Sequence, residues 1–226
     1  MWIDDQVIKK CGQSLAIECW IPENRMVVLG RSNKEETEVF GERCREDSIP
    51  VLKRYGGGGT VLLGPGCVVA SIGAWVSNPY DNDKYFDLLN SALIECFNSH
   101  FQKKDFGQRG YSDIVYGPKK FVGTSLFRSR KYLLYQASIL VDLDLEDINL
   151  YLRHPSKEPD YRKGRSHSDF LVGLSDLDSS YSVEKCLGGL QKGLEGALMK
   201  RLSDQLVEPQ MEHIPHLMKR AGIEVL

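Results

Sequence analysis

The chain has 226 residues, a net charge of −2 and 42% hydrophobic residues. These values predict one large folded domain, and they argue against intrinsic disorder. A protein that wraps nucleic acid usually carries a basic excess, so we expect no nucleic-acid partner. The six cysteines form no C-x-x-C pair. They are predicted to be reduced, buried thiols rather than zinc ligands or disulfides.

The beginning of the chain shows no charged segment followed by an apolar run, and no apolar stretch is long enough to cross a membrane. We therefore expect no signal peptide, no membrane span and a cytoplasmic location.

The first part of the chain alternates short strands with polar connections. Residues 15–21 and 26–31 are predicted as two strands around a turn. A polar, helix-permissive stretch covers residues 35–45. A short strand at 49–54 leads into a run of glycines, and residues 61–76 favour strands again, interrupted by a turn.

The second part of the chain contains the longer predicted helices. Apolar residues recur at helical spacing over residues 83–101. A short helix is expected at 145–152, and a helix weakened by glycines at 182–207. Strands are expected at residues 112–116, 119–128 and 132–141. Because helices stand between groups of strands, without regular βαβ alternation, the predicted fold class is α+β.

The strongest motif is the run of four glycines that follows Lys53-Arg54-Tyr55. Glycines let the backbone approach a ligand closely with its N–H groups exposed, and Arg54 can bind a phosphate or carboxylate through two nitrogens. The run is neither a Walker loop nor a dinucleotide fingerprint, because no Gly-Lys-Ser/Thr closes it and a strand follows it. A flexible hairpin tip is the competing interpretation.

Two further segments carry candidate functional residues. Lys120 follows a tight turn on a predicted strand, where its charge can stabilise developing oxygen charge, and Asp113 can hold magnesium or pair with that lysine. The charged segment 159–170 can cover an anionic intermediate or meet an acidic partner. The competing interpretations are a solvated hairpin and an ordinary surface loop.

The order and spacing of these motifs resemble the lipoate-protein ligase A family, within the biotin/lipoate ligase and octanoyltransferase superfamily. Residues 28–33 are similar to its "G-R-x-Q-N" segment, and residues 53–61 to "R-R-x-x-G-G-G-A-V". Ser112-Asp113 lies where the family has Asn-Asp. Lys120 lies on the lysine of "R-K-V-S-G-S", and residues 135–140 lie on "H-H-G-T-L-L".

This resemblance implies a mixed β-sheet flanked by helices, the biotin/lipoate ligase fold that is related to class II synthetases. It implies that the protein activates lipoate with ATP and Mg²⁺ to lipoyl-adenylate and transfers the acyl group to a lysine. The implied partners are lipoyl domains of 2-oxoacid dehydrogenases or the glycine cleavage H protein.

The resemblance also assigns roles to residues. Lys120 is the implied catalytic residue, and Asp113 the implied metal ligand. The implied substrate-binding residues are Arg54, Gly57, Gly58, Gly59, Thr60, Val61, Leu63, Asp113 and Ser138. An apolar tunnel for the acyl chain is expected to include Val61, Leu63, Ile72 and Val122.

The sequence departs from the family pattern at several positions. Leu63 and Gln136 replace family histidines, which leaves open a non-enzymatic binder with the same fold. Octanoyltransferases need a cysteine that forms a thioester, and Ser156 stands at one of its usual positions. Cys67 follows a Gly-Pro-Gly turn similar to that of the transferases. We interpret Cys67 as a packed thiol, but transfer from a carrier or donor domain without ATP stays open as the alternative.

Residues 1–180 are predicted to form the catalytic domain, and residues 181–226 a C-terminal helical segment packed on it. The latter is too short for the accessory domain typical of ligases in this family. A separate accessory subunit is therefore an expected partner. The biotin-ligase signature "G-R-G-R-x-G" is absent, which argues against biotin.

Overall fold

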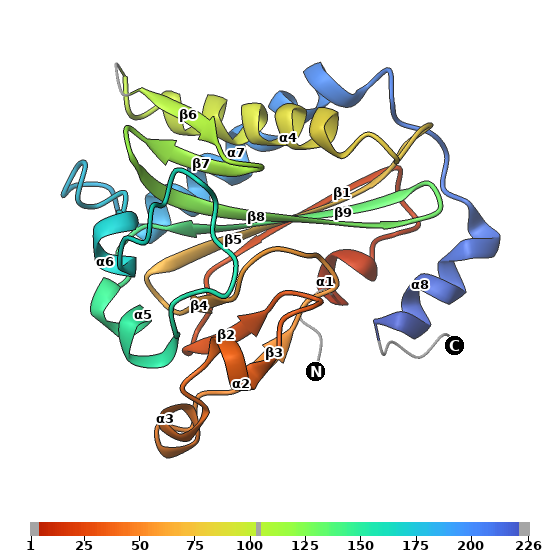
Figure 1. Cartoon of the computed structure of the whole chain (residues 1–226). Coiled ribbons are helices and arrows are strands. Elements are labelled where there is room, and N and C mark those ends of the chain that lie inside the picture. The colour runs from red at the N-terminus through yellow and green to blue at the C-terminus, as the bar shows by residue number, and fades with distance from the viewer. Residues whose placement is uncertain (1–4, 103–104, 222–226) are drawn as a thin grey trace.

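The computed structural model describes residues 5–102 and 105–221. Its centre is a six-stranded sheet with the order β1-β5-β9-β8-β7-β6, in which all neighbouring strands are antiparallel (Figure 1). The strands are β1 (Leu15–Trp20), β5 (Cys67–Trp75), β6 (Phe106–Arg109), β7 (Asp113–Tyr116), β8 (Lys119–Ser129) and β9 (Tyr132–Leu140).

A smaller sheet has the order β3-β2-β4, and β2 pairs parallel with β3 but antiparallel with β4. Its strands are β2 (Met26–Leu29), β3 (Val51–Lys53) and β4 (Val61–Leu63). The two strands predicted at 15–21 and 26–31 therefore exist but belong to different sheets. The predicted α+β class with helices flanking the sheets is confirmed, and the parallel pair lies in the smaller sheet.

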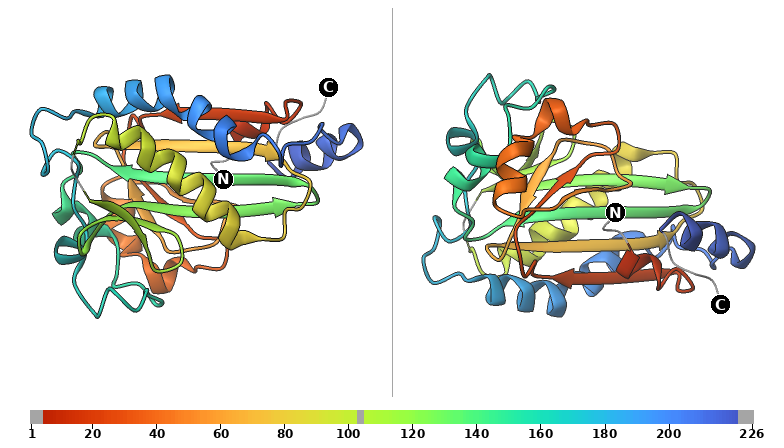
Figure 2. Two further views of the ribbon diagram at one scale, coloured as in Figure 1. Left: turned by 90° about the horizontal axis from the view of Figure 1, so that it is seen from above. Right: turned by 90° about the horizontal axis from the view of Figure 1, so that it is seen from below.

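Two long helices cover one face of the large sheet, α4 (Asn82–Asn98) and α7 (Val183–Leu202) (Figure 2). Both begin at a capping side chain: Asp81 accepts from the backbone N–H of Lys84, and Ser182 from that of Lys185. Such caps satisfy backbone donors that the first helical turn leaves unpaired. The apolar faces of both helices pack on the sheet in one large hydrophobic core.

All nine residues of β5 are buried, because both faces of the sheet are covered at this strand. Side chains alternate along a strand. Val68 and Ile72 point into the core below α4 and α7, whereas Val69 packs in a separate cluster with the smaller sheet. This opposite face of the large sheet carries the candidate site.

The remaining helices lie around the smaller sheet and near both ends of the large one (Figure 1). They are α1 (Asp5–Ile8), α2 (Glu35–Glu38), α3 (Gly41–Glu46), α5 (Leu145–Tyr151), α6 (His167–Phe170), the 3₁₀ turn η1 (Met211–His213) and α8 (Ile214–Arg220). No helix within the described residues is long and apolar enough to cross a membrane.

The predicted helices at 83–101, 145–152 and 182–207 correspond to α4, α5 and α7. Strand β6 and the short helices α1 and α6 were not predicted, whereas α8 lies within the segment predicted to be helical, 181–226. The boundary proposed at residue 180 stays a prediction, although α7 supplies core side chains to the large sheet. The first four residues of the predicted catalytic domain and the last five of the C-terminal segment lie outside the described residues.

Candidate functional site

The glycine run forms a loop that is joined to the turn after β2. The backbone N–H of Arg31 donates to the Gly56 carbonyl at 3.0 Å. At the other end of the loop, Asn33 Nδ2 donates to Thr60 Oγ1, also at 3.0 Å. The two segments that the sequence singled out at 28–33 and 53–61 are therefore one structural unit.

Arg54 stabilises this loop from inside. Its side chain is buried, and its Nη2 donates to the carbonyls of Gly57 and Gly59, each at 2.7 Å. Its Nη1 donates to the Val28 carbonyl at 3.3 Å. The guanidinium thus fixes the curvature of the loop in this structure. The predicted contact between Arg54 and a ligand stays a prediction.

The loop lies against β8, the strand that begins at Lys119. Gly56 packs on Ser125, and Gly58 has φ +92° and lies near the Thr124 carbonyl. Open space adjoins Gly57 and Gly59. Within the described residues, no group accepts a hydrogen bond from the N–H groups of residues 57–59. Such exposed N–H groups suit an anion.

Lys120 points inward from the start of β8 and forms an ion pair with Asp113 on β7. Its Nζ lies 2.7 Å from Asp113 Oδ1, and the two side chains are 22% and 14% exposed. The pairing of these strands places the two residues together, with a bulge between Ile114 and Val115. The pairing proposed from the sequence is present, and the ammonium does not extend into bulk water.

Ser138 on β9 lies beside this lysine. Gly123 pairs with Ser138 across the strands, and a Cβ at position 123 would lie 3.2 Å from Lys120 Nζ and 3.3 Å from Ser138 Oγ. Ser138 Oγ donates to the Gly123 carbonyl at 3.2 Å. Because residue 123 has no side chain, the Lys120 chain can lie close to the strand beside Ser138.

An apolar cluster extends from Ser138 toward the edge of the sheet. Strand register places Gly123, Ser138, Val69 and Trp20 in one row across four strands. Over this row, Val69 packs against residues of the smaller sheet. The cluster contains Val28, Leu63 and Val69, with Trp20, Met26 and Val61 partly buried against it.

Two of the predicted tunnel residues do not belong to this cluster. Ile72 and Val122 lie in the core below α4 and α7, on the opposite face of the large sheet. Alternation along β5 and β8 explains their orientation, since neighbouring side chains point to opposite faces. Val61 and Leu63 lie in the cluster, and their predicted role in binding the acyl chain stays a prediction.

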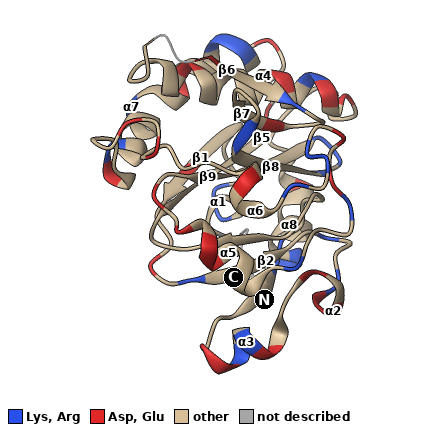
Figure 3. Ribbon diagram, turned by 60° about the vertical axis from the view of Figure 1, so that its left-hand side comes forward, with Lys and Arg blue, Asp and Glu red and all other residues tan. Residues whose placement is uncertain are grey.

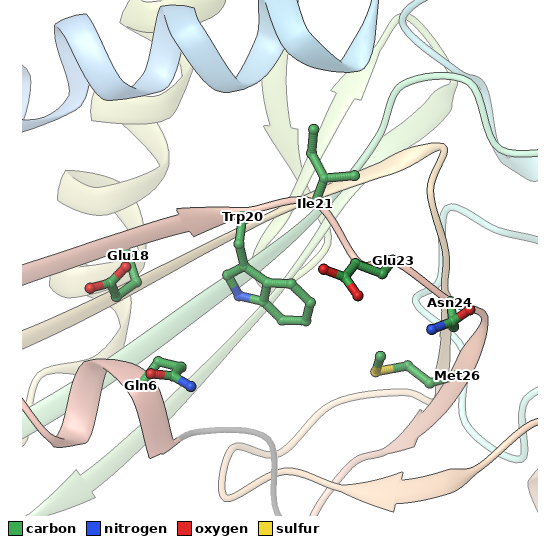
Figure 4. Close-up of a pocket in the computed structure, with 7 residues that line it drawn as sticks. All are labelled: Gln6, Glu18, Trp20, Ile21, Glu23, Asn24 and Met26. Atoms are coloured by element: carbon green, nitrogen blue, oxygen red, sulfur yellow. The ribbon is translucent and has the colours of Figure 1, made fainter.

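A cavity of about 520 Å³ lies at the far end of the row (Figure 4). The Trp20 side chain lies among the other lining residues, with Met26 on one side and Glu18 on the other. Its lining residues are Gln6, Glu18, Trp20, Ile21, Glu23, Asn24 and Met26. Since Trp20 and Met26 also contact the apolar cluster, the cavity adjoins the space between the two sheets.

The charged segment 159–170 contacts the turn before β8 through Arg165, whereas Asp160, Lys163 and Asp169 are exposed. Arg165 Nη2 donates to the carbonyls of Pro118 and Tyr161, at 3.1 and 2.9 Å. The backbone N–H of Val172 donates to the Lys120 carbonyl at 3.0 Å. Acidic and basic residues are interspersed around this end of the molecule in Figure 3, without a single basic face.

His167 begins α6, and its Nδ1 lies 3.2 Å from Asn149 Oδ1. Burial lowers the pKa of His167 to about 4, and the positive charges of Arg162, His154 and Lys120 act in the same direction. The imidazole is therefore neutral at neutral pH. His167 therefore adds no further positive charge near Lys120.

Cys67 is fully buried at the start of β5 and packs in a hydrophobic cluster with Leu140 and Leu143. Burial raises the pKa of its thiol to about 12. A nucleophilic cysteine needs an accessible thiolate, so these surroundings fit the predicted packed thiol.

The described residues do not form a protein-only metal site. Among them, no group of three His, Cys, Asp or Glu side chains could hold an ion. Asp113 is a single carboxylate, and both of its oxygens already interact with protein groups. Magnesium is usually held by one or two carboxylates together with substrate phosphates. The predicted role of Asp113 as a metal ligand stays a prediction.

Two sheets with flanking helices and an inward lysine near a glycine loop are the features that the family resemblance implied for the biotin/lipoate ligase fold. Residues 3–188 match the family model of the lipoyl protein ligase A/B catalytic domain, and the chain belongs to this family.

Two relatives illustrate how far the family's activities diverge. The chain is 24% identical over 207 residues to the inactive lipoate–protein ligase 2 of Plasmodium falciparum, covering 76% of this chain and 53% of that protein. It is 30% identical over 141 residues to the octanoyltransferase LipM of Kyrpidia tusciae, covering 55% and 52%. The chain spans about half the length of these curated relatives.

Solved structures confirm the fold. A bipartite lipoate protein ligase from Thermoplasma acidophilum superposes with a TM-score of 0.70 at 18% identity, covering 88% of this chain and 81% of that one. A lipoate-protein ligase A bound with ATP gives the same TM-score at 20% identity, with coverage of 96% and 85%.

Proposed function

We propose that this chain is a lipoate-protein ligase that activates lipoate with ATP and passes the lipoyl group to a lysine of a lipoyl domain. In the first step the lipoate carboxylate attacks the α-phosphate of ATP, and pyrophosphate leaves. In the second step the acceptor amine attacks the acyl carbonyl, AMP leaves, and the amine releases a proton. Both steps develop negative charge on oxygen, which a fixed cation stabilises.

The observation that carries this proposal is the Lys120–Asp113 pair beside the glycine loop. An ammonium held by one carboxylate can turn toward the oxygens of the acyl–phosphate junction. The exposed N–H groups of residues 57–59 and the hydroxyl of Ser138 supply further donors nearby. Mg²⁺ would come with the nucleotide phosphates, with Asp113 as the nearby carboxylate.

The proposed path of the acyl chain runs from Lys120 across Ser138 and Val69 to the Trp20 cavity. Three strand spacings of about 4.8 Å separate Gly123 from Trp20, which gives a path of about 14 Å. This length suits a medium-chain acyl group. The apolar side chains of the smaller sheet would cover it and exclude water.

The proposed partners are a lipoyl domain and a separate accessory subunit. The T. acidophilum ligase is bipartite and is described with its E2 lipoyl domain, and its fold matches this chain. We propose that such an accessory subunit takes part in adenylate formation.

The test is to incubate the protein with lipoate, ATP, Mg²⁺ and an apo lipoyl domain, with and without an accessory subunit of the bipartite type. A gain of the lipoyl mass on the domain that requires ATP supports the proposal. The absence of both lipoyl-adenylate and domain modification under all conditions would overturn it.

The second candidate is an acyltransferase that needs no ATP, which the similarity to an octanoyltransferase favours. Octanoyl carrier protein or a lipoylated domain would then be the donor. Modification of the apo domain from such a donor in the absence of ATP would support the transferase instead of the ligase.

A further inference from the structure

Asp113 is a shared acceptor for two groups from different parts of the chain. Its Oδ1 lies 2.7 Å from Lys120 Nζ, and its Oδ2 accepts a hydrogen bond from the Tyr161 hydroxyl at 2.9 Å. Tyr161 is 48 residues away in the sequence, in the charged segment 159–170. The two steps of the proposed ligase reaction assign no role to this hydroxyl.

We propose that Tyr161 is a positioning residue for Lys120, because its hydroxyl holds the carboxylate on which the Lys120 ammonium rests. This inference rests on the proposed function for its catalytic consequence. Held by one partner only, the Asp113 carboxylate can rotate about its side-chain bond. Held by two, it presents Oδ1 to Lys120 in one orientation.

The Tyr161 ring is itself fixed on several sides. It contacts the Phe170 ring at a centroid distance of 5.2 Å, and its backbone carbonyl accepts from Arg165 at 2.9 Å. The ring also packs on Gly110, where an added Cβ would lie 3.1 Å from Tyr161 Cε1. Gly110 has φ +60°, which a glycine adopts without strain. These contacts leave the hydroxyl aimed at β7.

Two physical properties fit the hydroxyl to this task. Burial and the nearby Asp113 charge raise the pKa of Tyr161, so its proton is retained and it acts as a donor over the working pH range. The phenol is uncharged and does not compete with Lys120 for an anionic substrate. When Lys120 turns from Asp113 toward a bound acyl–phosphate, Tyr161 still satisfies the carboxylate, so Asp113 is not left without a donor.

The test compares Tyr161→Phe with a matched control. Tyr151 also donates to an aspartate at 2.9 Å, Asp47 Oδ2, but it lies on α5 away from Lys120. Each substitution removes one hydroxyl and keeps the ring. We expect Tyr161→Phe to lower kcat for lipoyl transfer about 10-fold with a smaller change in KM, and Tyr151→Phe to leave both unchanged.

A mutant cycle shows whether Tyr161 acts through Asp113. Asp113→Asn should lower kcat, and adding Tyr161→Phe to that variant should have little further effect. Full additivity of the two substitutions, or wild-type kcat in Tyr161→Phe, would overturn the proposal.

A measurement that needs no activity separates this inference from the proposed function. The ¹H–¹⁵N signal of the Lys120 ammonium, assigned by its loss in Lys120→Met, should be sharp in the wild type and broadened in Tyr161→Phe but not in Tyr151→Phe. If the wild type neither adenylates nor transfers but this broadening occurs, the proposed function fails and the positioning contact stands. An unchanged signal in Tyr161→Phe refutes the positioning contact.

Discussion

The Cα of Gly30 packs directly on the carbonyl of Gly58, so closely that a Cβ at position 30 would lie 2.1 Å from the Gly58 oxygen. Backbone atoms cannot yield as a flexible side chain can, so residue 30 must be a glycine for the loop to keep its position. Gly30 ends the β2 segment, and Gly58 is the centre of the glycine loop. The motif at 28–33 therefore serves as the support on which the loop rests.

Gly30→Ala is expected to displace the glycine loop and to abolish most lipoyl transfer. The new Cβ would clash with the Gly58 backbone, so we also expect a loss of about 1–3 kcal/mol in the free energy of unfolding, measured by urea denaturation. Gly12→Ala is the control, since open space surrounds that glycine. If Gly30→Ala transfers lipoate at the wild-type rate, the support role of Gly30 is wrong.

Arg54→Lys tests whether the buried guanidinium holds the loop. Lysine has one ammonium and cannot reproduce the planar fork that serves the carbonyls of Val28, Gly57 and Gly59. We expect a loss of about 1–3 kcal/mol in unfolding free energy, together with faster hydrogen exchange in residues 56–60. Arg43→Lys, at an exposed position, should change neither. Retained stability and protection in Arg54→Lys would contradict the structural role of Arg54.

Lys120→Ala is expected to lower lipoyl transfer about 10²–10³-fold, because a cation at the developing oxygen charge is lost. The melting temperature should change little, since Asp113 keeps its hydrogen bond from Tyr161. Lys119→Ala, the adjacent residue, is the matched control for charge and should retain activity. A large fall in melting temperature with Lys120→Ala would instead mark the lysine as structural.

Many of the helices and strands, and the closeness of Asp113 to Lys120, could be predicted from local sequence patterns. Helical spacing located α4, and the tight turn Gly117-Pro118 located the β7–β8 hairpin, which brings Asp113 to Lys120. Contacts between distant segments left no such signal. Nothing local indicates that Tyr161 reaches Asp113, or that Arg54 turns back onto its own loop.

The sequence also could not show which apolar strand residues face the proposed path of the acyl chain. Ile72 and Val122 are apolar strand residues like Val69, and only the register with Ser138 assigns them to the opposite face. A shift of one residue exchanges the two faces of a strand. The parallel pairing of β2 with β3 could not be predicted either. It depends on how residues 30–50 run between the two strands, and their sequence does not indicate which strands pair.

His167 predicts a specific dependence of stability on pH. Its folded-state pKa of about 4 lies below the ordinary value of 6.5, so the unfolded state binds the proton more tightly. The contribution is fully present above pH 6.5 and is lost as pH falls from there toward 4. We expect the urea midpoint of the wild type to fall over this window, and His167→Gln to flatten the slope. An identical slope in both proteins would exclude His167 as the cause.

Cys67 allows a test of whether acyl transfer uses a thioester on the protein. A thioester route requires an accessible thiolate, whereas the Cys67 thiol is fully buried and its pKa is raised to about 12. We therefore expect Cys67→Ala to retain lipoyl transfer, with a stability loss of about 1 kcal/mol from the missing sulfur. Mass spectrometry of the wild type after exposure to octanoyl carrier protein should find no acyl group on Cys67. An octanoyl adduct on this residue, together with loss of transfer in Cys67→Ala, would reverse the conclusion, because burial would then have to be relieved during the reaction.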